Sequence, residues 1–262
     1  VAKIEEDGHG DFYDLTVPNT QCYFDDQGIL HHNSGKDWLS ARICAWVAYV
    51  LCNMVQPKRW LRPDVAIAVD ERIDIVNVAP KGDLAKEVFF EYLKRCCKSK
   101  FMEPYVPDQK GQILTERIVF PQLNLRLNSL NSSTKGLDGY NPLVSIMDEA
   151  DAFLDTEDKS NADKVYAILR TSATTRWSKF WLCFVLSYMR SGDGFMKRTL
   201  DQIKADLGKI AFHLRIEVFD QAASWEVNPN IYRDDPTIQA HYRNNPTEAA
   251  AMYEGIAPPV VG

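Results

Sequence analysis

The chain has 262 residues, a formal net charge of −6 and a mean hydropathy of −0.29. It holds no apolar run of membrane-spanning length, and its six cysteines lack the paired spacing of a metal site, which favours a protein of a reducing cytoplasm over a membrane protein or a disulfide scaffold. The charge is uneven. Residues 1–33 hold one Lys and seven acids, whereas the remaining 229 residues hold 29 basic and 29 acidic side chains. A neutral remainder carries no overall signature of nucleic-acid binding.

The acidic leader is expected to form short strands. Phe12–Pro18, Tyr23–Phe24 and Gly28–Leu30 are apolar stretches that predict two short strands around a turn. They lead into a polar junction at residues 31–34, His-His-Asn-Ser. The change in composition at this point predicts a boundary after residue 33.

Three residues of the junction have the functional groups for protein splicing. The side-chain amide of Asn33 can attack its own carbonyl, cyclise and cut the chain, and His32 can protonate the departing amine. Ser34 offers a hydroxyl nucleophile for the upstream polypeptide. The alternative interpretation of these residues is a polar loop.

Residues 1–34 resemble the C-terminal segment of an intein. The resemblance implies that Asp14 is the catalytic aspartate and gives the junction residues the roles just described. It also implies a partner, the N-terminal half of the intein. The family usually has a second histidine where this chain has Gln21, which cannot carry a proton, so either another group such as His31 substitutes or cyclisation is slower.

Beyond residue 33 the expected elements alternate between helix and strand, which predicts an α/β fold with a mainly parallel sheet and helices on both faces. In chain order they are a helix over 37–54, a strand over 73–79, a helix over 83–98, adjacent strands over 113–120 and 123–130, a strand over 143–147, a helix over 162–170, a strand over 180–186, a helix over 195–207, a last strand over 210–219 and short helical pieces after Asn228.

The first of these helices follows half of a phosphate-binding loop. Gly35 and Lys36 match the end of a Walker A loop, in which backbone amides and a Lys ammonium hold phosphates at a helix N-terminus. Asp37 stands where Ser or Thr normally binds magnesium, so its carboxylate or an intervening water would join the metal shell. The first half of the loop is expected from the upstream sequence, joined to Ser34 by splicing.

A pair of acids follows the strand over 143–147 in the layout of a Walker B motif. Asp148 would face the metal, and Glu149 would polarise the attacking water. Two acids at a strand end also occur in solvated turns and helix caps. The pattern gains weight from the half Walker A loop upstream, and together they predict a P-loop ATPase that uses ATP and Mg²⁺.

Two short stretches match the sequences of DEAD-type helicase motifs. Residues 148–151 have the sequence Asp-Glu-Ala-Asp, and residues 172–174 have the sequence Ser-Ala-Thr. In those helicases Ser-Ala-Thr ends a strand, whereas here it follows the helix over 162–170, so we predict a polar loop at 172–174. The residue at the end of the next strand is Ser187.

Residues 34–262 resemble the ATPase domain of a tailed-phage terminase large subunit. The motifs that carry the resemblance are Ser34–Trp38, Val78–Pro80, Val88–Phe90, Leu137–Pro142 ahead of Asp148-Glu149, Tyr166–Arg170, Ser187–Gly194 and Trp225–Pro229. The resemblance implies a RecA-like P-loop fold. It also implies that Ser187 belongs to the coupling motif that senses the γ-phosphate, and it makes Arg190 a candidate phosphate contact or a plain surface arginine.

The same resemblance implies the partners: double-stranded DNA, the small terminase subunit, the portal protein and further copies of the chain on the capsid, in the cytoplasm of an infected bacterial host. A nuclease domain would follow residue 262, so the chain itself should not cut DNA. Two alternatives stay open, namely another P-loop ATPase such as a DEAD-type helicase or translocase, and a binding module with a degenerate nucleotide site. The second is preferable if the upstream sequence lacks the glycine-rich half of the loop.

Overall fold

The computed structural model describes residues 22–24, 30–32, 36–55, 57, 71–80, 89–106, 109–131, 136–153, 161–177, 180–206, 223–227 and 231–260. The strand expected over 210–219 lies outside these ranges, as do Asp14, Asn33, Ser34 and Gly35. For β1, β2, Lys36 and Asp37 only the backbone is described.

The described chain alternates between helices and strands. Its elements are β1 (Cys22–Phe24), β2 (Leu30–His32), α1 (Lys36–Asn53), β3 (Ile73–Ala79), α4 (Glu91–Cys97), α5 (Gln109–Gln112), β4 (Arg117–Phe120), β5 (Leu125–Asn131), β6 (Pro142–Asp148), α6 (Ala162–Trp177), β7 (Leu182–Leu186), α7 (Phe195–Asp206), α8 (Ser224–Val227), α9 (Pro236–Asn244) and α10 (Pro246–Glu254). Short 3-10 turns η2, η3 and η4 cover Pro121–Leu123, Leu137–Gly139 and Ala150–Ala152.

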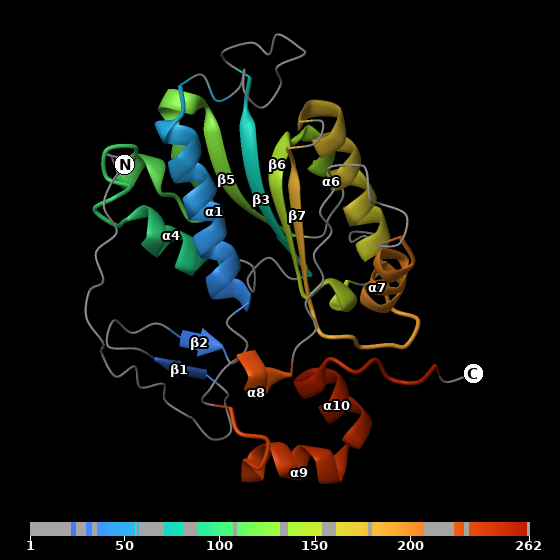
Figure 1. The fold of residues 1–262 in the computed structure, drawn as a ribbon. Helices are drawn as coiled ribbons and strands as arrows, with labels where there is room; N and C mark the ends of the chain where they lie inside the picture. The colour runs from blue at the N-terminus through green and yellow to red at the C-terminus, as the bar shows by residue number, and fades with distance from the viewer. Residues whose placement is uncertain are drawn as a thin grey trace.

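Five strands form one sheet in the order β4-β5-β3-β6-β7 (Figure 1). β5, β3, β6 and β7 run parallel, and β4 pairs antiparallel with β5. Every residue of β3 and of β6 is buried, as expected for the central strands of a parallel sheet covered on both faces. The prediction of a mainly parallel α/β sheet is confirmed.

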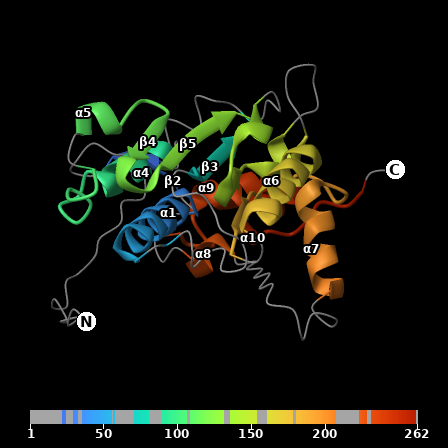
Figure 2. The ribbon, with the colours of Figure 1, turned by 90° about the horizontal axis from the view of Figure 1, so that it is seen from above.

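Helices cover both faces of this sheet (Figures 1 and 2). On one face α1 and α4 pack over a core that includes Ile75, Leu127 and Ile146. On the other face α6 and the start of α7 pack over a second core that includes Val76 and Met147. The two cores follow the alternation of side chains along the strands, in which every second residue faces the same side.

Two expectations about secondary structure are wrong in part. The polar loop expected at Ser172–Thr174 is helical, because α6 continues to Trp177, which is fully buried. The helix continues because Ala173 packs into the interior and the indole Nε1 of Trp177 donates a hydrogen bond of 3.1 Å to the carbonyl of Asn141. The strand expected over 113–120 begins only at Arg117, and Ile113 makes a single isolated bridge.

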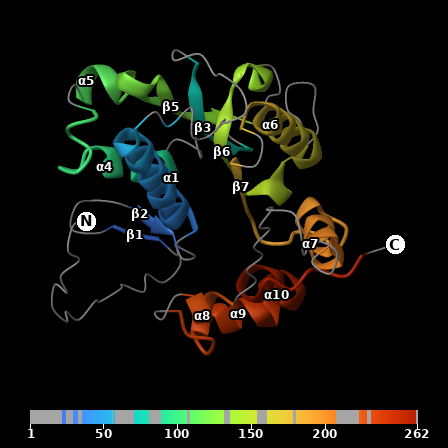
Figure 3. The same cartoon turned by 45° about the horizontal axis from the view of Figure 1, so that its top comes forward.

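The two ends of the described chain add a small hairpin and a small helical cluster to the sheet domain. β1 and β2 pair as an antiparallel hairpin, with Cys22 opposite His32, so short strands do form just before the junction, while the expected stretch Phe12–Pro18 lies outside the described residues. At the other end α8, α9 and α10 pack around Ile238, Ala249 and Tyr253 and lie together in Figure 3. No helix in the described ranges is long and apolar enough to cross a bilayer.

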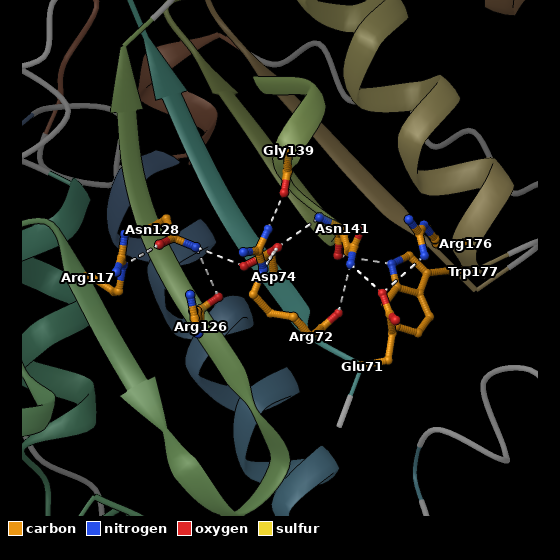
Figure 4. Close-up of polar contacts among 10 residues, drawn as sticks. All are labelled: Glu71, Arg72, Asp74, Arg117, Arg126, Asn128, Gly139, Asn141, Arg176 and Trp177. Atoms are coloured by element: carbon orange, nitrogen blue, oxygen red, sulfur yellow. Dashed lines mark hydrogen bonds and ion pairs between the residues drawn. The ribbon is translucent and has the colours of Figure 1, made fainter. Parts of the chain in front are cut away.

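A buried polar network holds the amino-terminal ends of β3 and β6 together (Figure 4). The carboxylate of Asp74, fully buried in β3, accepts hydrogen bonds from Arg72 Nε at 2.7 Å, from the backbone amide of Asn141 at 2.8 Å and from Asn128 Nδ2 at 3.2 Å. The indole Nε1 of Trp177 donates to the carbonyl of Asn141 at 3.1 Å. The residue before Pro142 is thereby held through both its amide and its carbonyl.

Candidate functional site

Asp148 and Glu149 lie at the carboxyl end of the central strand β6. Asp148 is the last residue of β6 and is 2% exposed, and it pairs in register with Leu186, the last residue of β7. The carboxyl ends of the two parallel strands therefore meet, and the turns that follow them lie side by side. Ligands of open parallel sheets bind at this edge, which makes it the candidate site.

Glu149 has a strained backbone. Its φ of 53° and ψ of 47° place it in the left-handed region, which glycine or asparagine adopts far more readily than glutamate. The only other non-glycine residue with positive φ in the described ranges is Asn124, in the turn between β4 and β5. Strain of this kind persists where surrounding contacts hold it, and it gathers at functional sites.

Asp151 joins the turn after β6 to the loop after β7. Its Oδ2 accepts a hydrogen bond from the backbone amide of Arg190 at 3.0 Å, and its Oδ1 accepts one from the amide of Met196 at 2.8 Å, in the first turn of α7. A carboxylate at a helix N-terminus also interacts favourably with the helix dipole. At Gly194 a Cβ atom would lie 2.8 Å from Asp151 Oδ2, so only glycine fits without displacing the carboxylate.

Ser187 sits between the two turns. Its Oγ accepts a hydrogen bond from the backbone amide of Asp151 at 3.3 Å and donates one to the carbonyl of Tyr188 at 3.0 Å. The structure therefore brings Ser187 next to the Asp148-Glu149 turn, as its place after β7 predicts.

Arg190 reaches from the same loop to the carboxylate of Glu149. Its Nη2 lies 3.5 Å from Glu149 Oε2, and its guanidinium carbon lies 4.8 Å from the centre of the Tyr188 ring. The Arg190 side chain is 44% exposed and that of Glu149 17% exposed, so solvent screens this ion pair in part. A guanidinium cation thus stands beside the carboxylate predicted to activate water.

The remaining predicted residues lie at the N-terminus of α1 or before it. The backbone of Lys36 and Asp37 forms the first turn of α1, and Figure 1 shows this turn at the same end of the sheet as the carboxyl end of β7. A helix N-terminus at this edge presents free amides to an anion. His32 ends β2, four residues before α1 begins.

A magnesium ion at this edge would have few protein ligands among the described residues. Asp148 offers a hard carboxylate oxygen of the kind that magnesium prefers. Among the described residues no group of three or more His, Cys, Asp or Glu side chains could hold a metal ion. This donor set suits Mg²⁺, which commonly binds through one or two carboxylates together with waters and substrate phosphates.

Asp151 and Gly194 are site residues that sequence reasoning missed. In the sequence Asp151 stands only as the last letter of a helicase-like tetrapeptide. The signal was present, because an acid three residues after a strand can cap a neighbouring turn, but its partners lie 39 and 45 residues further along the chain. Gly194 gave no signal of its own beyond its place in the loop.

Comparison with known proteins identifies the fold family. The family model described as "Uncharacterized protein MJ0330, N-terminal P-loop domain" matches residues 28–255. The chain belongs to this family. The P-loop domain is also 27% identical over 237 residues to the uncharacterized protein MJ0330 of Methanocaldococcus jannaschii, an alignment that covers 86% of this chain and 39% of that protein. The chain thus spans well under half the length of this curated relative.

Two solved structures are similar to the P-loop domain. The large terminase of bacteriophage HK97 aligns with a TM-score of 0.49 and 16% identity, covering 86% of this chain and 45% of that one. A mutant of the large terminase ATPase domain of Thermus phage P74-26 aligns with a TM-score of 0.47 and 13% identity, covering 86% and 85%.

Proposed function

We propose that this P-loop domain hydrolyses ATP with Mg²⁺ as part of a viral DNA-packaging motor of the terminase large-subunit type. The observation that carries ATP hydrolysis is the end of β6. There a buried Asp148 is followed by Glu149 in a left-handed conformation, beside the turn that starts at Ser187. A buried acid for the metal and an adjacent held acid for the water are the parts that phosphoryl transfer requires.

Each site residue has a role in this proposal. The amides at Gly35 and the ammonium of Lys36 hold phosphates, and Asp148 binds the magnesium ion with Asp37. Glu149 orients the attacking water. Ser187 and Arg190, described above, respond to the γ-phosphate from the loop after β7.

The packaging assignment rests on the ordered motifs of residues 34–262 that resemble terminase large subunits. In this proposal the partners are double-stranded DNA, the small terminase subunit and the portal protein, and copies of the chain assemble on the capsid in the cytoplasm of the infected bacterial host. A DEAD-type helicase is the weaker candidate, because the Ser-Ala-Thr stretch lies inside α6 rather than at the end of a strand.

The decisive experiment separates the two acids in the full-length protein that carries the complete phosphate loop. Glu149→Gln should keep Mg²⁺-dependent ATP binding while hydrolysis falls at least about 100-fold, since an amide cannot polarise water as a carboxylate does. Asp148→Ala should weaken Mg²⁺-dependent binding itself. Glu103→Gln, at an exposed glutamate outside the site, is the matched control. Equal loss of binding in both site variants contradicts the separate roles.

We also propose that residues 1–33 are a C-terminal intein segment with Asp14 as its catalytic aspartate. Mixed with the matching N-terminal intein half, the parent chain should release residues 1–33 and join Ser34 to the upstream polypeptide, as seen by intact mass. Asn33→Ala should stop release yet allow a branched ester on Ser34, and His32→Ala should slow the cleavage. Identical behaviour of the parent and Asn33→Ala chains would exclude splicing.

A further inference from the structure

Two polar side chains lie in the middle of the sheet without hydrogen bonds. Asn77 of β3 is 1% exposed and Ser129 of β5 is 4% exposed, and the two residues are register partners on adjacent strands. Neither the Oδ1 and Nδ2 atoms of Asn77 nor the Oγ of Ser129 has a hydrogen-bond partner in the structure as described. Buried polar groups are almost always paired, and an exception calls for a water, an ion or a ligand.

The placement of the pair in the sheet points to the candidate site. Residues alternate between the faces of a strand, so Asn77 and Ser129 lie on the face covered by α1. Asp148 lies on this same face, since it is two residues beyond Ile146, which belongs to the α1-side core and is the β6 partner of Asn77. With strands about 4.8 Å apart and a rise of about 3.3 Å per residue, the Cα atoms of Asn77 and Asp148 are about 8 Å apart. Asn77 thus lies between Ser129 and the Walker B aspartate.

Asn77 and Ser129 interrupt the apolar side chains of this face near the carboxyl ends of β3 and β5. The deeper positions of the face are apolar, Ile73 and Ile75 in β3 and Leu125 and Leu127 in β5. The next positions along the two strands are Asn77 and Ser129. Ala79 and Asn131 end the two strands on this face, so Asn77 and Ser129 lie one position before the carboxyl edge.

The sheet does not leave its buried polar side chains unpaired in general, so the lack of hydrogen bonds at Asn77 and Ser129 needs its own explanation. Asn128, next to Ser129 in β5 and 3% exposed, donates to Asp74 and accepts from Arg117 Nε at 3.1 Å. An apolar residue at position 77 would pack against the same neighbours without leaving an amide unpaired. A polar ligand that hydrogen-bonds to the Asn77 amide and the Ser129 hydroxyl would explain why neither group has a partner within the protein.

We propose that Asn77 and Ser129 form the outer wall of the magnesium site, where they hydrogen-bond water molecules in the hydration shell of an ion held at Asp148. The inference rests on the proposed function and adds two positioning residues to it. Mg²⁺ keeps several of its waters when it binds to proteins. The carboxamide oxygen of Asn77 and the hydroxyl of Ser129 accept hydrogen bonds from such waters, and groups of this kind orient the ion's ligands.

The test measures metal affinity and stability separately in the full-length protein. Mn²⁺, which has an electron paramagnetic resonance signal, is titrated in the presence of a non-hydrolysable ATP analogue, and the melting temperature of each variant is measured without metal or nucleotide. Asn77→Leu should weaken Mn²⁺ binding about 10–100-fold, the usual effect of losing an outer-shell partner. Its melting temperature should stay the same or rise, because an unpaired buried amide is removed.

Ser129→Ala and Ser145→Ala are a matched pair, since both remove one hydroxyl from a buried position of the sheet. Ser145 is 1% exposed in β6 and faces the side of α6, opposite to Ser129. Ser129→Ala should weaken Mn²⁺ binding up to about 10-fold and Ser145→Ala should not change it. Ser129→Ala also carries the test if Asn77→Leu fails to fold.

Two results would overturn the inference. Unchanged Mn²⁺ affinity in Asn77→Leu and Ser129→Ala, in a parent protein that binds Mn²⁺ with nucleotide, would show that the pair does not serve the metal while leaving the proposed function in place. A parent protein that binds no Mn²⁺ with nucleotide would remove the proposed function and the inference together.

Discussion

Replacing Glu149 by glycine should stabilise the fold relative to replacing it by glutamine. Both substitutions remove the ion pair with Arg190, so their comparison cancels that contact. The glutamine variant would still have to adopt φ near 53° at this position, whereas glycine adopts this conformation without steric cost. The comparison therefore isolates the backbone strain at the end of β6.

The size of the effect follows from two opposing contributions. A left-handed conformation costs a residue with a Cβ atom about 1–2 kcal/mol. Glycine also makes the unfolded chain more flexible, which offsets about 0.4–1 kcal/mol of this gain. The Gly variant should therefore exceed the Gln variant by about 1 kcal/mol in free energy of unfolding, or about 2–4 °C in melting temperature for a domain of this size.

Urea unfolding followed by circular dichroism measures the difference, with the slope of the transition checked for constancy. Asn124→Gly and Asn124→Gln repeat the comparison at φ 49°, in a turn away from the candidate site, and should differ in the same direction. If Gly exceeds Gln in stability at position 124 but not at position 149, the reasoning that the turn after β6 stores backbone strain is refuted.

Three further outcomes are expected. Asp74→Ala should lower the free energy of unfolding by about 3 kcal/mol in urea, because it leaves buried hydrogen-bonding partners unpaired; a loss below about 1 kcal/mol would mean that the network relaxes. Arg190→Ala should change it by less than about 1 kcal/mol, since its pair with Glu149 is screened, and a larger loss would show a buried role. Burial, reinforced by Glu254, raises the pKa of Tyr242 to about 12 from its usual 10, so the stability due to the neutral phenol should be present below pH 10 and be lost as the pH rises toward 12. Tyr242→Phe should flatten that decline, and an unchanged decline would assign it to other groups.

The strands of the sheet could be predicted because their sequences carry the pattern of buried parallel strands. The strand expected over 73–79 coincides with β3, and the one over 143–147 lies within β6, since runs of Val, Ile and Leu between turn residues have few alternatives. The position of the two acids at the end of β6 could be predicted for the same reason, because a strand end fixes where the next residues lie.

Contacts between distant segments were beyond such reasoning. The extension of α6 through Ser172–Thr174 depends on Trp177, whose indole donates to the carbonyl of Asn141, and polar residues on the outer face of a helix look locally like a loop. The role of Asp151 depends on amides 39 and 45 residues away. Periodicity reports which face of an element is buried, but not which loop comes to lie beside it.

The pairing of β3 with β6 skips one residue, since Asp74 lies opposite Pro142 and Ile75 lies opposite Val144. Beyond this bulge the two strands pair residue by residue. Because side chains alternate between the two faces, the register set at the bulge decides which face Asp148 occupies, about 20 Å further along β6. A shift by one residue therefore moves every later side chain of the strand to the opposite face of the sheet. Inserting one residue after Val144 would turn Asp148 to the side of α6, so the chemistry at one edge of the sheet depends on the anchoring contacts of Asp74 at the other.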